Sequence, residues 1–326
     1  MSLKIEDMEK FMKGQMEYWR QVDESEGFDL ESVSVPQGTT GLLPFDCERV
    51  KDHQPLLVRL YARLGLHRYN ISKGTNFVFR HLKKYNQSMA CLSSYYITLV
   101  ACDPATPTSL VTFQVGVGEK AYGRLYVMCF CARLQGPPKK PFTALDVGAA
   151  VVDGGGLPLW PSDFSDRTRF HILEESELQN NDWVRLYLEL ALCANDRGIS
   201  DDSVLSQLHI LKVAIGLAEY WAQRVTKHST FVYITFKGLA RARVGELGEH
   251  VERKVIVRRI IDMDSGCLTL QGGFGFSIGE EAHEQRPMSR PEGEWPLTGP
   301  PTWLSEDVPP IQKSDLEGIR FLDWSK

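Results

Sequence analysis

The residue types that most often bind metals or phosphates are present in this sequence, but their spacing does not bring them together. No two of the eight histidines lie one, three or four residues apart, as paired metal ligands do. The glycine pairs Gly116-x-Gly118 and Gly272-Gly273-x-Gly275 are followed by no lysine with serine or threonine, so they do not match a phosphate-binding loop. These residues predict no catalytic residue, no metal site and no cofactor.

The seven cysteines lie at irregular positions, which is typical of reduced core thiols and not of a disulfide framework. Cys129 and Cys131 lie two residues apart in a predicted strand and therefore face the same side. They lack the second pair or the nearby histidine that a zinc site needs. We interpret them as small core residues.

The charge distribution argues against a body that binds nucleic acid. Residues 277–326 hold ten acids and five bases, which accounts for the whole net charge of −5 and leaves the remainder neutral. Nucleic-acid binding needs an excess of lysine and arginine to release counterions. Positive charge gathers around one predicted hairpin, the candidate basic patch of Arg241, Arg243, Arg253, Lys254, Arg258 and Arg259. These residues either contact nucleic acid or protect a sheet edge from aggregation.

Residues 1–26 are predicted to contain an amphipathic helix over residues 4–24. Its apolar residues alternate at spacings of three and four, which is the pattern of a coiled-coil seam over about three heptads. The candidate partner-binding residues in this seam are Ile5, Met8, Met12, Trp19 and Val22. Phe11, Met16 and Tyr18 widen the apolar face beyond a strict seam. The helix therefore either docks on the protein's own surface or binds a partner, including a second copy of the chain.

Residues 27–138 are predicted to form a first domain, in which one helix covers an antiparallel sheet. Leucines with helical spacing predict a helix from residue 54 to about residue 70. Alternating apolar residues predict strands at 75–84, 93–103, 109–118 and 122–134. Both faces of the last strand are apolar, so we expect another element to cover its second face.

Residues 139–276 are predicted to form a second domain of the same kind. Alternation predicts a strand with Val184, Leu186, Leu188, Leu190 and Leu192 on one face. Further strands are predicted at 211–217, 232–236, 251–263 and 267–271. The similarity of YYITLVACD (95–103) to LYLELALCAND (186–196) suggests an internal duplication. Residues 277–326 are predicted to be a flexible, proline-rich acidic tail.

Together these elements predict an α+β protein with two helix-on-sheet domains. The chain of 326 residues is 43% hydrophobic and 24% charged, which is ordinary composition for a globular protein. The first residues contain no apolar run, and no apolar stretch of about 18 residues occurs. We therefore expect neither a secretory leader nor a membrane span, and an intracellular protein.

The chain resembles the plant male-sterility-five family, which is expanded in crucifers, largely uncharacterised and described as cystatin-related. The resemblance spans residues 17 to about 271. The segments that carry it are EYWRQVDESEGFD (17–29), SVPQGTTGLLPFDC (34–47), LVRLYARLGLHRYN (57–70), DWVRLYLELAL (182–192), VYITFKGLARARVGE (232–246) and RKVIVRRI (253–260).

This resemblance implies two cystatin-like domains and a non-enzymatic protein that acts through other proteins. The family takes its name from a member needed for male fertility that acts in meiosis, so the resemblance implies a nuclear location, with a cytoplasmic one as the alternative.

Two alternative functions stay open at this point. Cystatins block papain-like proteases with a Gln-x-Val-x-Gly hairpin, and the matching place here is Gln87-Ser88-Met89-Ala90-Cys91. Cys91 replaces the glycine that gives the hairpin its backbone freedom, which argues against a divergent protease inhibitor. The other alternative is a cone-shaped α+β fold that binds a ligand or catalyses a reaction without a sequence motif.

Overall fold

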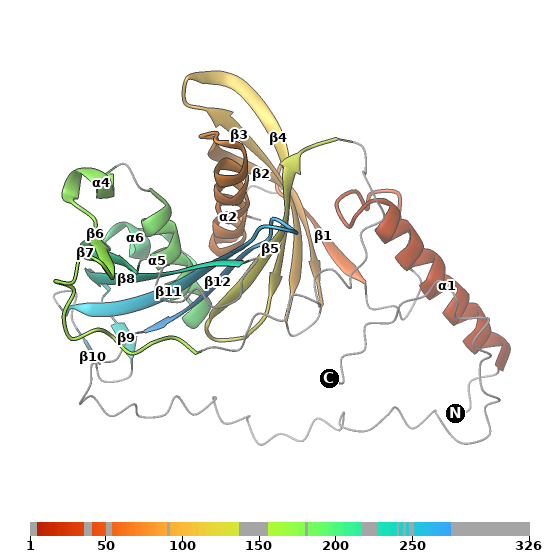
Figure 1. Cartoon of the computed structure of the whole chain (residues 1–326). Coiled ribbons are helices and arrows are strands. Elements are labelled where there is room, and N and C mark those ends of the chain that lie inside the picture. Colours follow the sequence, from red (N-terminus) through yellow and green to blue (C-terminus); the bar gives the residue numbers. More distant parts are fainter. Residues whose placement is uncertain are drawn as a thin grey trace. The chain divides into compact units, whose positions relative to one another are not determined.

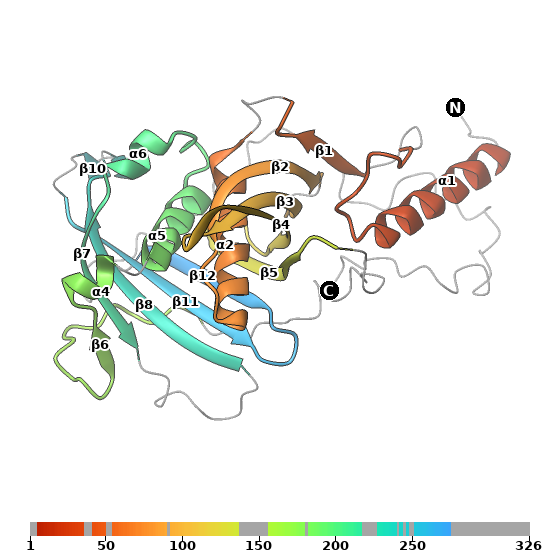
Figure 2. The ribbon, with the colours of Figure 1, turned by 90° about the horizontal axis from the view of Figure 1, so that it is seen from above.

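Ten antiparallel strands form one sheet, in the order β1-β2-β3-β4-β5-β12-β11-β8-β7-β6 (Figures 1 and 2). The computed structural model describes residues 5–35, 41–49, 54–89, 92–136, 156–179, 182–216, 227–239, 241–243, 246–247 and 251–274. The bounds of the strands are β1 (Leu42–Asp46), β2 (Val78–Ser88), β3 (Ser94–Asp103), β4 (Thr106–Glu119), β5 (Leu125–Leu134), β6 (Phe170–Ile172), β7 (His209–Gly216), β8 (Lys227–Lys237), β11 (Arg253–Asp262) and β12 (Leu268–Phe274). A separate pair is formed by β9 (Arg241–Arg243) and β10 (Glu246–Leu247).

The described helices are α1 (Ile5–Glu24), α2 (Leu56–Lys73), α4 (Glu175–Gln179), α5 (Asp182–Asn195) and α6 (Asp202–Ser206). The main core lies between the sheet and the two helices α2 and α5, which cover the same face. We call this the helix face, and we call the opposite one the outer face. The predicted helix over residues 4–24 is confirmed by α1, and the predicted helix near residues 54–70 is confirmed by α2.

The sequence of α2 explains its position. Pro55 is compatible with the start of a helix, and Gly74 ends the helix with a φ of +63°, which glycine adopts without strain. Between these ends, Leu60 and Leu64 have the i, i+4 spacing of one helix face and are fully buried against the sheet.

The segment with Val184 and the four alternating leucines is a helix, α5, and the predicted strand is wrong. Alternation also fits a helix that is buried on most of its sides, and α5 buries residues all along its length, including Tyr187 and Ala191. Leucine and alanine favour a helix over a strand, whereas only Val184 in this run of buried residues is β-branched.

The strands of both predicted domains belong to one sheet, because β5 pairs with β12. This pairing differs from the two separate sheets expected from the sequence. Val127 pairs with Leu270, and both lie in the core that α2 and α5 share. The predicted boundary at residue 138 and the whole tail 277–326 lie outside the described residues.

The two halves of the sheet repeat one topology. The order β1-α2-β2-β3-β4-β5 corresponds to β6-α5-β7-β8-β11-β12, and the strands follow each other in mirrored order on either side of the β5–β12 junction. The two segments whose similarity suggested a duplication are not equivalent, because residues 95–103 lie in β3 and residues 186–195 lie in α5. The two halves therefore share a topology, but the similarity of these two segments does not reflect it.

Candidate functional site

The C-terminal end of α1 docks on the outer face of the first half of the sheet. Tyr18 and Val22 are 1% and 4% exposed, and they pack with Phe28 against Tyr96 of β3. The hydroxyl of Tyr18 accepts a hydrogen bond of 2.7 Å from the backbone N–H of Leu42, at the start of β1. Phe130 of β5 packs against the same cluster, so these contacts help to cover the second apolar face of β5, which was predicted to need a cover.

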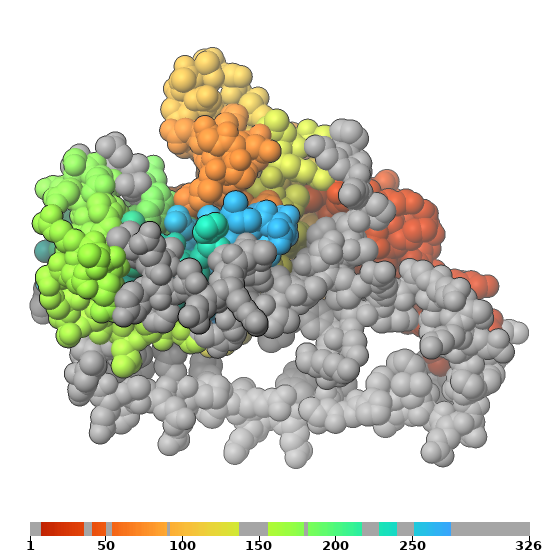
Figure 3. All heavy atoms as spheres, viewed as in Figure 1, coloured from red at the N-terminus to blue at the C-terminus, as the bar shows by residue number. Residues whose placement is uncertain are grey.

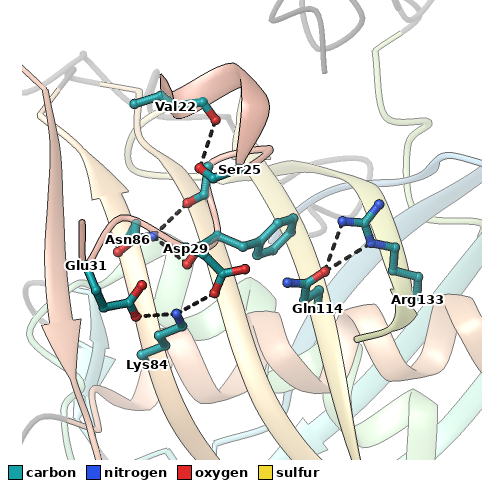
Figure 4. Close-up of polar contacts among 10 residues, drawn as sticks. Val22, Ser25, Asp29, Glu31, Lys84, Asn86, Gln114 and Arg133 are labelled. Carbon is teal, nitrogen blue, oxygen red and sulfur yellow. Dashed lines mark hydrogen bonds and ion pairs between the residues drawn. The ribbon is translucent and has the colours of Figure 1, made fainter. Parts of the chain in front are cut away.

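The segment that follows α1, residues 25–31, is held on the sheet by charged groups; we call this segment the strap. The ammonium of Lys84 on β2 donates a hydrogen bond of 2.6 Å to Asp29 and also contacts the carboxylate of Glu31 (Figure 4). Burial lowers the pKa of Lys84, but the hydrogen bonds to these two carboxylates outweigh burial and raise it overall. Lys84 therefore stays charged and joins two points of the strap to one strand.

Backbone groups of the strap are held equally closely. The side-chain amide of Asn86, which is 2% exposed, donates to the carbonyl oxygens of Gly27 at 2.6 Å and Phe28 at 3.1 Å. Gly27 has a φ of +76°, and a Cβ at this position would lie 2.7 Å from the ring of Tyr96. Only glycine fits here, because both the backbone conformation and the close approach to the ring exclude a side chain.

A third contact joins the strap to β5. Arg133 forms an ion pair with Glu26, which is 8% exposed. It also donates to the Gln114 side chain from Nε at 3.1 Å (Figure 4). Burial lowers the pKa of Arg133, whereas the bond to Glu26 raises it and prevails. Because both charged groups are largely removed from water, loss of either partner would leave the other uncompensated.

Two of the residues that hold the strap, Lys84 and Arg133, belong to one polar row that crosses five neighbouring strands. Pairing in register places these side chains next to each other on the outer face. From the sheet edge inward, the polar row consists of Asp46, Lys84, Thr98, Gln114 and Arg133.

The rest of α1 carries apolar residues that its docking contact does not bury. Among the candidate partner-binding residues, Val22 is buried, Met8 and Met12 are half-buried and Trp19 is 40% exposed, while the side chain of Ile5 lies outside the described residues. Phe11 and Met16 are also exposed, at 38% and 39%. The structure thus places Val22 of the predicted seam in an anchor and leaves Trp19 of the seam exposed. Trp19 and the flanking residues Phe11 and Met16 are the exposed apolar residues of α1, and we call these three residues the exposed stripe.

The candidate basic patch is not brought together on one face. Arg253 is buried at 5% and donates to the carbonyl of Leu239 at 2.6 Å, while Arg259 lies over the ring of Trp183 on the helix face. On the outer face, Lys254 lies over the ring of Trp160, and Arg258 donates to Ser229 at 2.9 Å. The side chains of Arg241 and Arg243 lie outside the described residues. The residues of the patch on β11 lie on two faces because neighbouring residues of a strand point to opposite faces.

Comparison with known proteins identifies the family. A family model described as Protein MS5 matches residues 157–270. UPF0725 protein At3g19520 of Arabidopsis thaliana is 45% identical over 89% of this chain and 98% of its own length. The chain belongs to the MS5 family. Putative UPF0725 protein At1g28500, from the same plant, is 45% identical over 82% of the chain and 88% of its own length. The crystal structure of MS5 from Brassica napus covers 69% of this chain and 99% of that chain, with 30% identity and a TM-score of 0.53.

Two buried acids among the described residues join the two halves of this MS5-family chain. The carboxylate of Glu119 on β4 accepts hydrogen bonds from Tyr61 at 2.8 Å, while Arg197, which follows α5, forms an ion pair with it at 3.0 Å. Burial, and then the charge of Glu119, raise the pKa of Tyr61 well above its usual value. In the same way Glu189 on α5 pairs with Arg63 on α2 at 2.7 Å. These paired carboxylates act as structural links, because their oxygens are engaged and are not placed to accept a substrate proton.

The described part of this MS5-family chain contains no group of three or more histidine, cysteine, aspartate or glutamate residues arranged to hold a metal ion. None of its described helices is long and apolar enough to cross a membrane.

Two features of the site were missed by reasoning from the sequence. Tyr18 was placed on the flank of the seam, yet it is the most deeply buried residue of the α1 anchor.

A second feature is Gly275-Phe276-Ser277-Ile278-Gly279, which matches the Gly-x-Ser-x-Gly nucleophile elbow and follows β12. It lies outside the described residues, and its strand belongs to an antiparallel sheet, whereas the elbow belongs to α/β-hydrolase sheets. The pattern alone therefore does not indicate a hydrolase here.

Proposed function

We propose that this MS5-family protein is a non-enzymatic recognition protein and that α1 is its partner-binding element. The observation that carries the proposal is the division of α1 into an anchored end and an exposed apolar stripe. Tyr18 and Val22 are buried on the sheet, whereas Phe11, Met16 and Trp19 keep more than a third of their surface exposed. An exposed apolar stripe of this kind is typical of a protein–protein contact.

The anchor makes this helix suitable for binding. A free helix of about 20 residues must lose conformational entropy when it binds, which weakens the complex. In this chain, three side chains of the sheet hold the strap directly after the helix: Lys84, Asn86 and Arg133. The strap therefore fixes the direction in which α1 leaves the sheet before any partner arrives.

Two kinds of partner fit the stripe. An apolar groove on another protein would receive the helix through anchors at i, i+3 and i+4 spacing. A second copy of the chain would pair with it as a short coiled coil. Of the predicted seam of Ile5, Met8, Met12, Trp19 and Val22, only Val22 is taken up by the anchor on the sheet. Both kinds belong to the same proposal, since both use the part of α1 beyond its anchored end and both bury Trp19.

We place this role in plant male fertility and meiosis, in the nucleus, on the strength of the family resemblance. A cytoplasmic location is the alternative.

We also propose that each half is a divergent cystatin-like unit. In each half one helix precedes four antiparallel strands: α2 precedes β2–β5, and α5 precedes β7, β8, β11 and β12.

The test replaces Phe11, Met16 and Trp19 by glutamine in the full chain. The matched control replaces Glu9, Lys10 and Lys13 by glutamine on the charged face of the same helix. Self-association is measured by sedimentation, and binding to other proteins by quantitative capture from developing anthers. We expect the stripe variant to lose association or specific captured proteins that the control retains. Equal behaviour of the two variants in both measurements would reject α1 as the binding element.

The absence of an enzymatic activity is tested separately. A fluorophosphonate probe labels activated serines, and we expect no labelling of Ser277 in the full chain. Labelling that disappears in Ser277→Ala would replace our proposal with a hydrolase. A papain assay tests the inhibitor alternative, and we expect full protease activity at high excess of the protein.

A further inference from the structure

The first residues of β7 form a sheet edge that no described strand covers. The strand β6 pairs with β7 only from Ala214 to Gly216, and one further backbone bond, from the N–H of Leu173 to the carbonyl of Val213 at 3.0 Å, extends this pairing. Residues 209–212 therefore pair with β8 on one side and with no strand of the described chain on the other. Their backbone groups that point away from β8 are available to another polypeptide.

The side chains of this edge do not close it. Lys212 carries the charge that could protect the edge, but its ammonium lies 5.1 Å from the centre of the Phe164 ring, on the outer face. Leu211 on the same edge and Ile172 at the end of β6 keep 40% and 38% of their surface exposed. The edge is thus open and partly apolar, which is the condition under which another strand can add to a sheet.

A cavity lies beside this edge, between β7 and the helices α4 and α5. Its volume is about 380 Å³, and each of the three elements contributes an apolar side chain to its lining: Leu178 of α4, Val184 of α5 and Ile210 of β7. A groove between an edge strand and a helix suits an extended peptide, because the peptide backbone pairs with the edge while alternate side chains enter the groove.

The charges of this cavity favour a basic partner. Glu175 and Asp182 line it, are exposed to water and form no ion pair with any residue that the structure describes. The guanidinium of Arg185 also lines the cavity, but it is engaged by the carboxylate of Glu189 at 2.9 Å and by two backbone carbonyl oxygens. The remaining basic residue of the lining is His209, and histidine is mostly neutral at pH 7. Two carboxylates are therefore left to attract a cation.

We propose that the edge of β7 binds an extended segment of another protein, which adds as a strand beside residues 209–212. An aliphatic side chain of this segment enters the cavity, and a neighbouring lysine or arginine meets Glu175 and Asp182. The backbone bonds supply affinity and the side chains supply selectivity. This surface belongs to the second half of the sheet, whereas α1 docks on the first half, so the proposal does not depend on the function proposed for α1.

The test titrates the full chain, labelled with ¹⁵N, with an acetylated and amidated peptide of sequence Lys-Val-Ile-Val-Lys. The first control peptide carries N-methyl groups on its three central residues, which removes backbone pairing and keeps the side chains. We expect the amide signals of residues 209–212 to shift, and the methylated peptide to bind at least about tenfold more weakly. Equal binding of the two peptides, or no shift of these amides, would overturn the proposal. This comparison uses the natural chain throughout and does not depend on the folding of a variant.

A second control peptide, Glu-Val-Ile-Val-Glu, tests the charge preference. It should bind at least about tenfold more weakly than the lysine peptide. The pair Glu175→Gln with Asp182→Asn should reduce this preference to less than about threefold, whereas the exposed acid variant Asp264→Asn, outside the cavity, should leave it unchanged. A preference that survives in the double variant would reject a basic partner.

Variants of the apolar lining test the role of the cavity. Leu178→Gln should weaken binding of the lysine peptide about fivefold. Leu159→Gln is the control, because Leu159 is 69% exposed and does not line the cavity, and it should leave binding unchanged. If Leu178→Gln does not fold, the milder Leu178→Ala replaces it. Unchanged binding in the Leu178 variant would reject the cavity as the place that receives the aliphatic side chain.

A second copy of the chain is the other strand that could occupy this edge. Sedimentation of the variant with glutamine at Phe11, Met16 and Trp19 tests this outcome without association through the exposed stripe. We expect this variant to be a monomer that still binds the lysine peptide. A dimer that the lysine peptide dissociates would assign the edge to a second copy and would reject a separate partner.

Discussion

The two halves of the sheet share a topology but cover their outer faces differently. In the second half, residues 156–170 place Trp160 and Phe164 around Tyr233 of β8, with ring centroids 5.6 and 5.4 Å from it. In the first half, α1 and the strap place Phe28 against Tyr96 of β3, the strand equivalent to β8, at 5.7 Å. One loop and one long helix with its strap thus perform the same task, which is to keep water from an aromatic residue on the outer face. Figure 3 shows the atoms of α1 in red and those of the first residues of the second half in yellow-green.

This difference shows which part of α1 covers the sheet and which part extends beyond the cover. Residues 156–169, which contain no helix, contribute this cover in the second half, so the cover does not require a helix of 20 residues, about 30 Å long. Only the C-terminal end of α1, with Tyr18 and Val22, contributes to the cover. The remaining length of α1 does not belong to this described cluster, which is the reason for our proposal that it binds a partner.

The largest effect should follow from removing the aromatic cover of the second half. Trp160→Ala opens a cavity beside Tyr233 and should lower the free energy of unfolding by about 4 kcal/mol. Leu159→Ala is the control, because this neighbouring residue is 69% exposed and should change the value by less than about 0.5 kcal/mol. Urea unfolding measures both. If Trp160→Ala also abolished association through α1, the two covers would not be independent.

Acid should weaken the contact between the halves. His67 on α2 lies 3.0 Å from the Tyr187 hydroxyl on α5, and burial, with a smaller effect of Arg259, lowers its pKa from 6.5 to about 4. Between these pH values the unfolded chain binds a proton that the folded chain does not, so the folded state loses stability as pH falls. The full contribution is about 3 kcal/mol, reached near pH 4, with no loss above pH 6.5.

Urea unfolding at several pH values between 7.5 and 4.5 measures this effect. His67→Gln should be less stable at neutral pH but should have a shallower dependence on pH. An unchanged dependence in the variant would assign the acid sensitivity to other groups.

A smaller difference, of about 2 kcal/mol between two glycine substitutions, should follow at the strap. Gly27→Ala combines a φ of +76° with a clash against Tyr96, whereas Gly123 has a φ of +69° and open space around its Cβ position. Gly123→Ala should cost about 1 kcal/mol from backbone strain alone, and Gly27→Ala about 2 kcal/mol more. The strap variant should also make α1 more sensitive to limited proteolysis. Equal costs of the two substitutions would show that the strap does not lie against Tyr96.

The smallest effect on stability is expected in the exposed stripe. Replacement of Phe11, Met16 and Trp19 by glutamine should change the free energy of unfolding by less than about 0.5 kcal/mol per residue, because these side chains are exposed. Thermal unfolding checks this prediction. A loss of several kcal/mol would mean that the stripe is packed against the protein and belongs to the cover.

Much of the first half could be predicted from the sequence, because its elements carry clear local patterns. The 3.6-residue period of α1 and α2 and the alternation along β3 and β4 identified these elements. The helix α5 could not be identified in this way, since a helix buried on most sides shows no polar face. The joining of the two sheets also escaped prediction, because the apolar second face of β5 indicates that a neighbour is needed but not which one.

The anchor of α1 could not be predicted from the sequence, for a different reason. Lys84 and Asn86 hold residues more than 50 positions away, and such polar contacts leave no local pattern in the sequence. Gly27 is a signal that could have been used, because a glycine just after a helix often takes a positive φ. The sequence therefore indicated the amphipathic helix, whereas only the structure separates its buried anchor from its exposed stripe.

Hydrogen exchange along α1 in the full chain tests the central claim most directly. If the helix is fixed at one end and exposed along the rest, amides from Tyr18 to Glu24 should exchange much more slowly than those from Met8 to Met16. Uniform and strong protection from Met8 to Glu24 in the isolated chain would mean that α1 is packed along its whole length, and it would contradict the account.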